Sequence, residues 1–305
     1  MNNVREYTVG VSNVHTVYVR ETGNPTGVPV VQIHGGPGSQ SKESHVGLFD
    51  LDVFRVIQID QRGCGRSTPL GEIQENTTQD LIEDMERVRE YLNIDQWIVS
   101  GASWGSTLAL LYAEAYPERV RGLFVRSIFL ARKQDIDWLH TGVAEFFPDL
   151  WEIRKQQMQE LGVTADQLSA KLFEMLQSED IAVQKKAVAI YASWEVNFLN
   201  LENRFMIPTP DEVDEEYIPG NLVYHHYDVN GFFVKENQIL ANVDKIRDIP
   251  TVIVHGRYDM ICRPSQAYEL YQELTYATLE ITNFDGHTFG GETKRLMRYL
   301  VKTLV

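Results

Sequence analysis

Cysteine is scarce in this chain of 305 residues, which contains only Cys64 and Cys262. Two cysteines cannot build the disulfide framework that holds many small secreted proteins together, and no metal-ligand spacing surrounds either of them. We therefore expect two free thiols in a reducing cytoplasm, a fold that depends on its own core, and no bound metal or other cofactor.

Positive charge and long apolar runs are also in short supply. The chain has 28 Lys and Arg residues against 43 Asp and Glu residues, a net charge of −15, which would repel the phosphates of a nucleic acid. The longest apolar stretches, such as Leu108–Ala113, are far shorter than a membrane span, and the N-terminus does not resemble a signal peptide. We expect a cytoplasmic protein without nucleic-acid or membrane partners, and the oligomeric state stays open.

Short apolar runs alternate with helical patterns in the first 130 residues. The expected strands are Val28–Ile33, Phe54–Ile59, Trp97–Val99 and Gly122–Val125. The expected helices are 77–92, which Thr77 or Thr78 caps, and 105–116, which stops before Pro117. Alternation of this kind indicates an α/β fold, with a mostly parallel sheet covered on both faces.

The strand pattern gives way to charged, aromatic and helical sequence between residues 131 and 247. Within this range, 165–177 and 181–198 read as amphipathic helices and 208–217 reads as an exposed acidic loop. Strand patterns return at Thr251–His255 and Thr278–Ile281, before a closing helix at Glu292–Leu304. We predict a core domain of residues 1–130 and 248–305, interrupted by a helical cap domain of residues 131–247.

A Gly-x-Ser-x-Gly motif stands at residues 101–105, in Gly101-Ala102-Ser103-Trp104-Gly105. It follows an expected strand and precedes an expected helix, which is the setting of a nucleophilic serine on a tight strand-to-helix turn. Both glycines leave room for that turn, and the helix points free N–H groups at the reaction centre. The motif predicts that Ser103 is the nucleophile of a serine hydrolase.

Backbone N–H groups must stabilise the oxyanion that forms when a serine attacks a carbonyl. One donor is predicted to be the N–H of Trp104, the residue after the nucleophile. The other should come from the loop His34-Gly35-Gly36-Pro37-Gly38, with Gly35 as the first choice and Gly36 as the second. We expect His34 to brace this loop by hydrogen bonding.

The acid and the general base are expected late in the chain, in the order serine, acid, histidine. His287 lies in the loop after the last expected strand, where it can take the proton of Ser103. Asp259 follows the preceding strand and is the predicted partner that orients His287. Asp285 competes for this role but suits a turn, and His255 precedes the acid and fits the order poorly.

A second polar cluster, His225, His226 and Asp228, lies in the helical range. Adjacent histidines rarely share one ion, and no third ligand is spaced for it, so we expect no metal there. The cluster is predicted to lie on the cap surface or in a pocket.

Four segments, taken in order, carry a family resemblance. They read His34-Gly35-Gly36-Pro37-Gly38, Asp60-Gln61-Arg62-Gly63-Cys64-Gly65-Arg66-Ser67, Ser103-Trp104-Gly105-Ser106-Thr107-Leu108-Ala109-Leu110 and Val254-His255-Gly256-Arg257-Tyr258-Asp259. Together they resemble the proline iminopeptidase family of α/β-hydrolases over most of the chain. The resemblance implies a Ser103–Asp259–His287 triad beneath a helical cap.

The resemblance also implies where a substrate amine binds. In that family, acidic cap residues bind the free amine of an N-terminal proline, and one lies in a Trp-Glu pair that Trp194-Glu195 matches. The second lies in a segment best matched by residues 223–228, where Tyr224 replaces the glutamate. Glu202 is a rival placement, seven residues after Glu195. The strand-to-helix turn at residues 101–105, which we call the elbow, also has Ala102 where the family usually has glycine.

These residues favour an aminopeptidase that releases N-terminal proline, or a similar small residue, from short peptides. Because Tyr224 replaces a carboxylate, an esterase or amidase for a neutral small acyl substrate is the alternative. A ligand-binding sensor that retains the fold is a third hypothesis, against which the intact triad argues. Haloalkane dehalogenase and epoxide hydrolase chemistry need a carboxylate at the elbow, so Ser103 argues against both.

Overall fold

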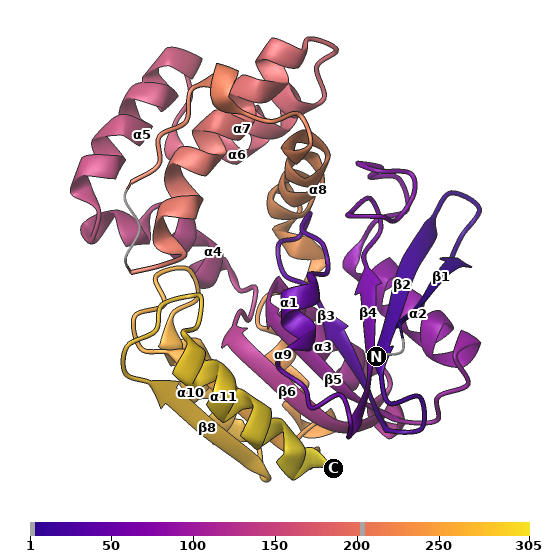
Figure 1. The fold of residues 1–305 in the computed structure, drawn as a ribbon. Helices are drawn as coiled ribbons and strands as arrows, with labels where there is room; N and C mark the ends of the chain where they lie inside the picture. The colour runs from indigo at the N-terminus through magenta and orange to yellow at the C-terminus, as the bar shows by residue number, and fades with distance from the viewer. Residues whose placement is uncertain (1–3, 202–204) are drawn as a thin grey trace.

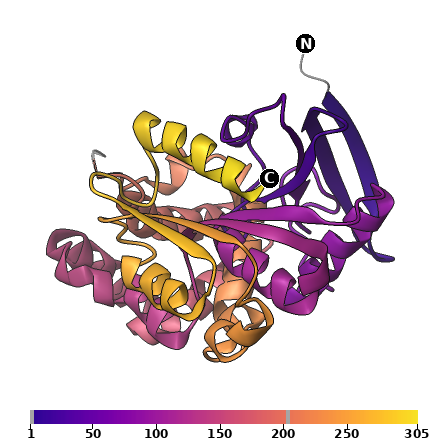
Figure 2. The same cartoon turned by 90° about the horizontal axis from the view of Figure 1, so that it is seen from below.

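A single twisted sheet of eight strands runs through the computed structural model, which describes residues 4–201 and 205–305 (Figure 2). The strand order is β1-β2-β4-β3-β5-β6-β7-β8. The strands are β1 (Val4–Gly10), β2 (Thr16–Gly23), β3 (Val28–Ile33), β4 (Phe54–Asp60), β5 (Trp97–Ser103), β6 (Val120–Ile128), β7 (Thr251–Gly256) and β8 (Ala277–Thr282). All six expected strands are confirmed, and most extend by one to four residues beyond the apolar run that predicted them.

The six strands from β4 to β8 pair in parallel, whereas β1 and β2 form an antiparallel pair that joins the sheet at β4. Sequence analysis did not assign β1 and β2. Their sequences, VREYTVG and TVYVRETG, mix charged and apolar residues, because an antiparallel edge can face water on one side. The continuous apolar runs used to find strands mark only those buried on both faces.

Successive side chains of a strand enter two different cores on the two faces of the sheet. Val30 packs in one core with Val46 and Met297, whereas its neighbour Val31 packs in the other with Leu81. The first core is covered by α1 (Glu43–Val46) and α11 (Gly291–Leu300), and the second by α2 (Thr78–Tyr91), α3 (Trp104–Ala115) and α10 (Pro264–Glu273). This sandwich confirms the predicted α/β class.

All the elements in the described part of 131–247, which we call the cap, are helical. They are α4 (Lys133–His140), α5 (Pro148–Leu161), α6 (Ala165–Leu176), α7 (Ile181–Glu195), α8 (Tyr217–Val229) and α9 (Gln238–Ala241). Figure 1 shows α5 to α8 gathered on one side of the sheet. Helices α5 to α8 also share a small core of their own, centred on Leu168, Leu172 and Ile190.

Short 3-10 helices join or end several elements. They are η1 (Pro117–Arg119), η2 (Gly142–Glu145), η3 (Val196–Phe198), η4 (Pro210–Glu212), η5 (Gly231–Phe233), η6 (Val243–Lys245) and η7 (Val301–Leu304). The two helices expected at 181–198 and 292–304 are each an α-helix followed by one of these. Helix α2 begins after Thr77, which forms a capping box with Asp80. No helix in the described ranges has the length and apolar character needed to cross a bilayer.

A buried ion pair ties the loop after β4 to helix α2. Arg62 donates from Nε to Asp84 Oδ2 and from Nη2 to Asp84 Oδ1, both at 2.6 Å, and both side chains are almost fully buried. This two-pronged contact fixes the loop directly beside Gln61, whose side chain reaches Trp104 at the start of α3.

Replacing Arg62 by methionine should lower the free energy of unfolding by about 3–5 kcal/mol, because the buried Asp84 would lose its two-pronged partner and keep only the longer ion pair to Arg87 at 3.6 Å. Urea denaturation followed by tryptophan fluorescence measures this loss. The double variant Arg62→Met/Asp84→Leu should recover part of it, since both charges are then gone. A double variant no more stable than the single one would contradict this account of the pair.

Candidate active site

Ser103 stands where strand β5 passes into helix α3. Its backbone lies in the left-handed region, with φ 58° and ψ −130°, a conformation that non-glycine residues adopt only under constraint. A Cβ atom on Gly101 would overlap the carbonyl oxygen of Gly105, and one on Gly105 would lie 2.7 Å from the carbonyl oxygen of Ile33. The two glycines are therefore required for the turn, as the motif predicted.

Gly35 lies directly against the serine. A Cβ atom built on it would be 3.4 Å from Ser103 Cβ and 4.0 Å from Ser103 Oγ. The N–H of Trp104 opens helix α3, where the first-turn N–H groups have no partner within the helix. The two predicted donor residues thus flank the serine, on the loop after β3 and at the start of α3.

A network of buried side chains holds these two backbone segments together. Gln61 accepts a hydrogen bond from Trp104 Nε1 at 2.9 Å and donates from its side-chain nitrogen to the carbonyl oxygen of His34 at 2.9 Å. The backbone N–H of Gln61 donates to His34 Nε2 at 3.0 Å, and His34 Nδ1 lies 2.8 Å from the carbonyl oxygen of Gly35. The bracing role predicted for His34 is confirmed, and Gln61 emerges as the centre of the network.

His287 and Asp259 form a close pair beside the elbow. His287 Nδ1 lies 2.9 Å from Asp259 Oδ2 and 3.0 Å from Oδ1. Asp259 Oδ1 also accepts from the backbone N–H groups of Ile261 at 3.0 Å and Cys262 at 2.8 Å, which fix the carboxylate. This arrangement leaves His287 Nε2 free to act on a substrate or a serine hydroxyl.

The charges of this pair support each other. Burial alone would raise the pKa of Asp259, but His287 and the backbone N–H of Cys262 outweigh burial and lower it. Burial alone would lower the pKa of His287, but Asp259, with help from Glu195, raises it above the ordinary value of 6.5. The imidazolium form of His287 is thus stabilised, as a general base requires once it has taken a proton.

Asp285 and His255, the weaker candidates for the catalytic acid and base, have structural roles. Asp285 accepts from the N–H of Gly290 at 2.8 Å and from the hydroxyl of Thr293 at 2.6 Å, so it ties the loop after β8 to the start of α11. His255 accepts from the N–H of Ile128 at 3.0 Å and contacts the carbonyl oxygen of Cys262 at 2.7 Å, which uses both its ring nitrogens. Neither is available as a catalytic acid or base.

Among the described residues, no side-chain hydrogen bond joins Ser103 Oγ to His287 Nε2. The Ser103 hydroxyl lowers the pKa of the Cys262 thiol, which burial raises strongly, so the two side chains lie close together. In enzymes without substrate, catalytic hydrogen bonds are often long and tighten only in the complex. The missing hydrogen bond is therefore compatible with the predicted pairing of Ser103 and His287.

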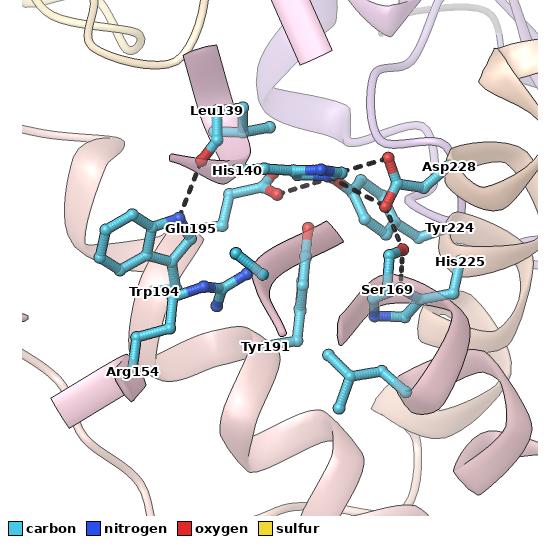
Figure 3. A pocket seen from close by; sticks show the side chains of 12 residues that line it. Leu139, His140, Arg154, Ser169, Tyr191, Trp194, Glu195, Tyr224, His225 and Asp228 are labelled. Carbon is cyan, nitrogen blue, oxygen red and sulfur yellow. Dashed lines mark hydrogen bonds and ion pairs between the residues drawn. The ribbon is translucent and has the colours of Figure 1, made fainter. Parts of the chain in front are cut away.

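A small polar cavity of about 20 Å³ lies between the cap helices (Figure 3). Its lining includes Glu195, Tyr191 and Tyr224, and the Tyr224 hydroxyl donates to Glu195 Oε2 at 2.9 Å. Burial raises the pKa of Glu195, although its hydrogen bonds to Tyr191 and Tyr224 lower it. No arginine, lysine or histidine among the described side chains forms an ion pair with Glu195.

A second carboxylate, Asp228, lines the same cavity one helical turn after Tyr224. Its charge is already matched, because His140 Nε2 lies 3.1 Å away and the hydroxyl of Ser169 also donates to it. Burial would lower the pKa of His140, but Asp228 outweighs burial and raises it, which favours the charged form of His140. Arg154, the other cation of the cavity, lies over the ring of Trp194 at 4.8 Å.

A larger groove of about 450 Å³ lies between the cap and the loop at residues 34–38, which we call the oxyanion loop. Its walls include Pro37 and Lys42 on one side and Tyr217 of α8 on the other, and Tyr191 and Tyr224 separate it from the polar cavity. The volume is typical of a small-ligand site.

The structure thus brings together most of the residues predicted from the sequence. Ser103, Gly35 and Trp104 meet at the elbow, His287 pairs with Asp259, and Glu195 meets Tyr224 in the cap. Glu202 lies outside the described residues. The sequence interpretation put Asp228 on the cap surface or in a pocket, and Asp228 does line the cavity, but its partner His140 was missed. Gln61 was missed as well, because nothing in its own segment marks a contact with Trp104.

Comparison with known proteins agrees with this geometry. The sequence model of a family described as alpha/beta hydrolase fold matches residues 28–290. Proteins named proline iminopeptidase from Arabidopsis thaliana and Neisseria gonorrhoeae are 41% and 42% identical to this chain, covering 91% and 89% of it and 73% and 86% of their own length.

Solved structures confirm the fold. The crystal structure of a proline iminopeptidase from Mycobacterium smegmatis superposes with a TM-score of 0.66 at 18% identity, over 98% of this chain and 97% of that one. An α/β hydrolase from a deep-sea metagenome library superposes with a TM-score of 0.67 at 17% identity, over 98% and 96%. From its sequence relatives, its fold and its elbow, the chain belongs to the proline iminopeptidase family of α/β-hydrolases.

Proposed function

We propose that this protein is a serine aminopeptidase that releases N-terminal proline, or a similar small residue, from short peptides. The observation that carries the proposal is the carboxylate of Glu195, which lies in a polar cavity near the triad and forms no ion pair with any described side chain, although Arg154 lines the same cavity. A buried carboxylate without an ion pair is costly, and a substrate ammonium would supply one.

The chemistry assigned to the triad is acyl transfer. Ser103 Oγ attacks the carbonyl carbon of the first residue while His287 Nε2 takes its proton, and Asp259 holds His287 through Nδ1. The N–H groups of Gly35 and Trp104 stabilise the oxyanion. His287 then returns the proton to the leaving amine, and a water activated by His287 hydrolyses the acyl-enzyme.

The second carboxylate of the amine site is not required in this arrangement. Asp228 lies 3.1 Å from His140 Nε2 and raises the pKa of His140, which favours a positive charge that offsets its own. Tyr224, which stands where the family has a second glutamate, instead donates a hydrogen bond that holds Glu195 in place. The cavity of about 20 Å³ suits a group no larger than an ammonium or a water molecule.

The preference for short peptides rests on the proposed division into a core, 1–130 and 248–305, and a cap, 131–247. Helix α8 of the cap approaches the oxyanion loop so closely that a Cβ atom on Gly38 would overlap the carbonyl oxygen of Gly220. The groove of about 450 Å³ beside this contact has room for a few residues of leaving peptide but not for a folded chain.

Replacing Gln61 by leucine should lower kcat about 10- to 100-fold with little change in KM, because the two oxyanion segments lose their brace. Steady-state kinetics on proline β-naphthylamide measure this effect. Gln266→Leu is the matched control, since Gln266 is equally buried but accepts from Leu130 N at 2.8 Å, away from the oxyanion loop. Equal losses of kcat in the two variants would contradict the assigned role.

The rate should fall on the acidic side of neutrality as His287 becomes protonated. Because Asp259 and Glu195 raise the pKa of His287 above 6.5, the acidic limb of kcat/KM on a neutral p-nitrophenyl ester is expected above pH 6.5. Glu195→Gln should move this limb to lower pH, since one negative charge near the imidazole is lost. An unchanged limb in that variant would show that Glu195 does not act on His287.

Glu195→Gln should reduce kcat/KM for proline β-naphthylamide about 100- to 1000-fold, which corresponds to losing the partner of a buried charge. Turnover of p-nitrophenyl esters should change little, because they carry no amine. Glu179→Gln, a change at an exposed cap glutamate, is the control and should affect neither substrate. Rapid ester turnover without any cleavage of proline substrates by the unmodified protein would instead favour a hydrolase for neutral acyl compounds.

A further inference from the structure

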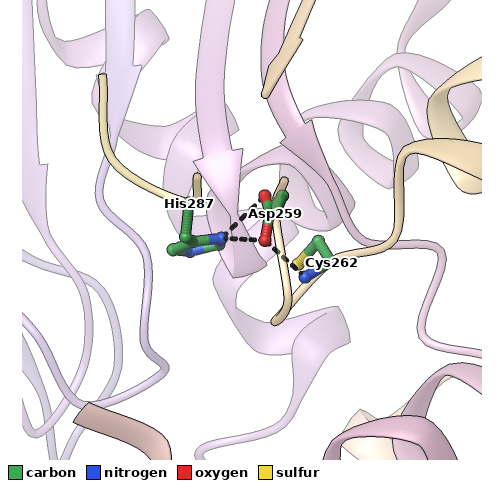
Figure 4. Close-up of side chains that lie close together, drawn as sticks. All are labelled: Asp259, Cys262 and His287. Atoms are coloured by element: carbon green, nitrogen blue, oxygen red, sulfur yellow. Dashed lines mark hydrogen bonds and ion pairs between the residues drawn. The ribbon is translucent and has the colours of Figure 1, made fainter. Parts of the chain in front are cut away.

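Cys262 lies within the catalytic cluster although the mechanism does not use its side chain. It is 1% exposed, its N–H donates to Asp259 Oδ1 at 2.8 Å, and its carbonyl oxygen contacts His255 Nε2 at 2.7 Å. Both backbone contacts fix the residue, so the thiol is held in one place. Figure 4 shows this thiol beside the Asp259 carboxylate, with the His287 ring on the other side.

The three side chains offer a convergent set of metal ligands. The thiol of Cys262, a carboxylate oxygen of Asp259 and a ring nitrogen of His287 all lie within 4.8 Å of one another. The nearest pair, His287 Nδ1 and Asp259 Oδ2, is 2.9 Å apart. Sulfur, nitrogen and oxygen donors together suit zinc, whereas magnesium and calcium prefer oxygen alone.

We propose that Asp259, Cys262 and His287 form an inhibitory binding site for Zn²⁺ that overlaps the catalytic triad. Three protein ligands leave a fourth, open position, as in many zinc sites that keep a solvent ligand. The proposal concerns the triad itself and does not depend on which substrate the cap selects.

Zinc binding would disable the base by changing where its proton resides. The Cys262 thiol releases one proton to solvent as the Zn–S bond forms, and Asp259 and the thiolate together balance the charge of the ion. Zinc takes the lone pair of His287 Nδ1, so the single proton of the neutral ring moves to Nε2. Nε2 can then no longer accept the proton of Ser103, and acylation stops.

Asp259 supplies the negative charge that a divalent ion would meet in this cluster. Its carboxylate is buried and is fixed by the backbone N–H groups of Ile261 and Cys262.

The first test is a ZnCl₂ titration of p-nitrophenyl ester turnover in a non-chelating buffer. The unmodified protein and Cys64→Ala should both be inhibited, and EDTA should restore the rate. Cys262→Ala, scored against its own metal-free rate, should need at least about tenfold more Zn²⁺ for half inhibition, since a ligand is lost. Cys64 is the matched control because it is equally buried but is not part of the ligand cluster.

The second test does not depend on activity. CoCl₂ added to the unmodified protein should produce a sulfur-to-cobalt charge-transfer band in the near ultraviolet. The band should persist in Cys64→Ala and disappear in Cys262→Ala and Cys262→Ser. A missing band in the unmodified protein, or equal zinc inhibition with and without Cys262, would overturn the proposal. Because neither readout uses a proline substrate, these outcomes are separate from a failure of the aminopeptidase assignment.

Discussion

The strained backbone of Ser103 is the constraint on which the site depends. A φ of 58° at a serine is held only because strand β5 on one side and helix α3 on the other are both buried and rigid. That turn aims the side chain at the end of the sheet and exposes the first N–H groups of α3 beside it. The loops after β3, β7 and β8 end at the same edge, so Gly35, Asp259 and His287 reach the serine from separate parts of the chain.

Charge in the cap is distributed unevenly, and this gives the cap its chemistry. Two carboxylates line one cavity, but only Asp228 has an ionic partner, His140, while Glu195 is held by the neutral hydroxyls of Tyr191 and Tyr224. If Tyr224 takes the place of a second glutamate, as the family resemblance implies, it puts a donor that holds Glu195 where a carboxylate would repel it. Glu195 then remains the cavity carboxylate that has no ion pair among the described side chains, while Arg154 lies over the ring of Trp194.

Much of the sheet and the triad could be predicted from the sequence, because local patterns encode them. Val28–Ile33 is a strand buried on both faces, and Gly101–Gly105 is a turn that needs small residues. Each can therefore be predicted from a few consecutive residues. The edge strand β1 lacks such a run, since one face meets water. Gln61 and Asp228 owe their roles to Trp104 and His140, which lie 43 and 88 residues away along the chain, and no local pattern records such contacts.

The pair of Asp259 and His287 also shows why a catalytic site and a metal site can share residues. A base needs a fixed, ionised carboxylate to orient it, and a zinc ligand set needs the same two groups in the same proximity. What separates the two uses is the third group. With Ser103 engaged, His287 works through Nε2 and Nδ1 keeps its proton. With the Cys262 thiol engaged, Nδ1 must give that proton up, so each use of His287 excludes the other.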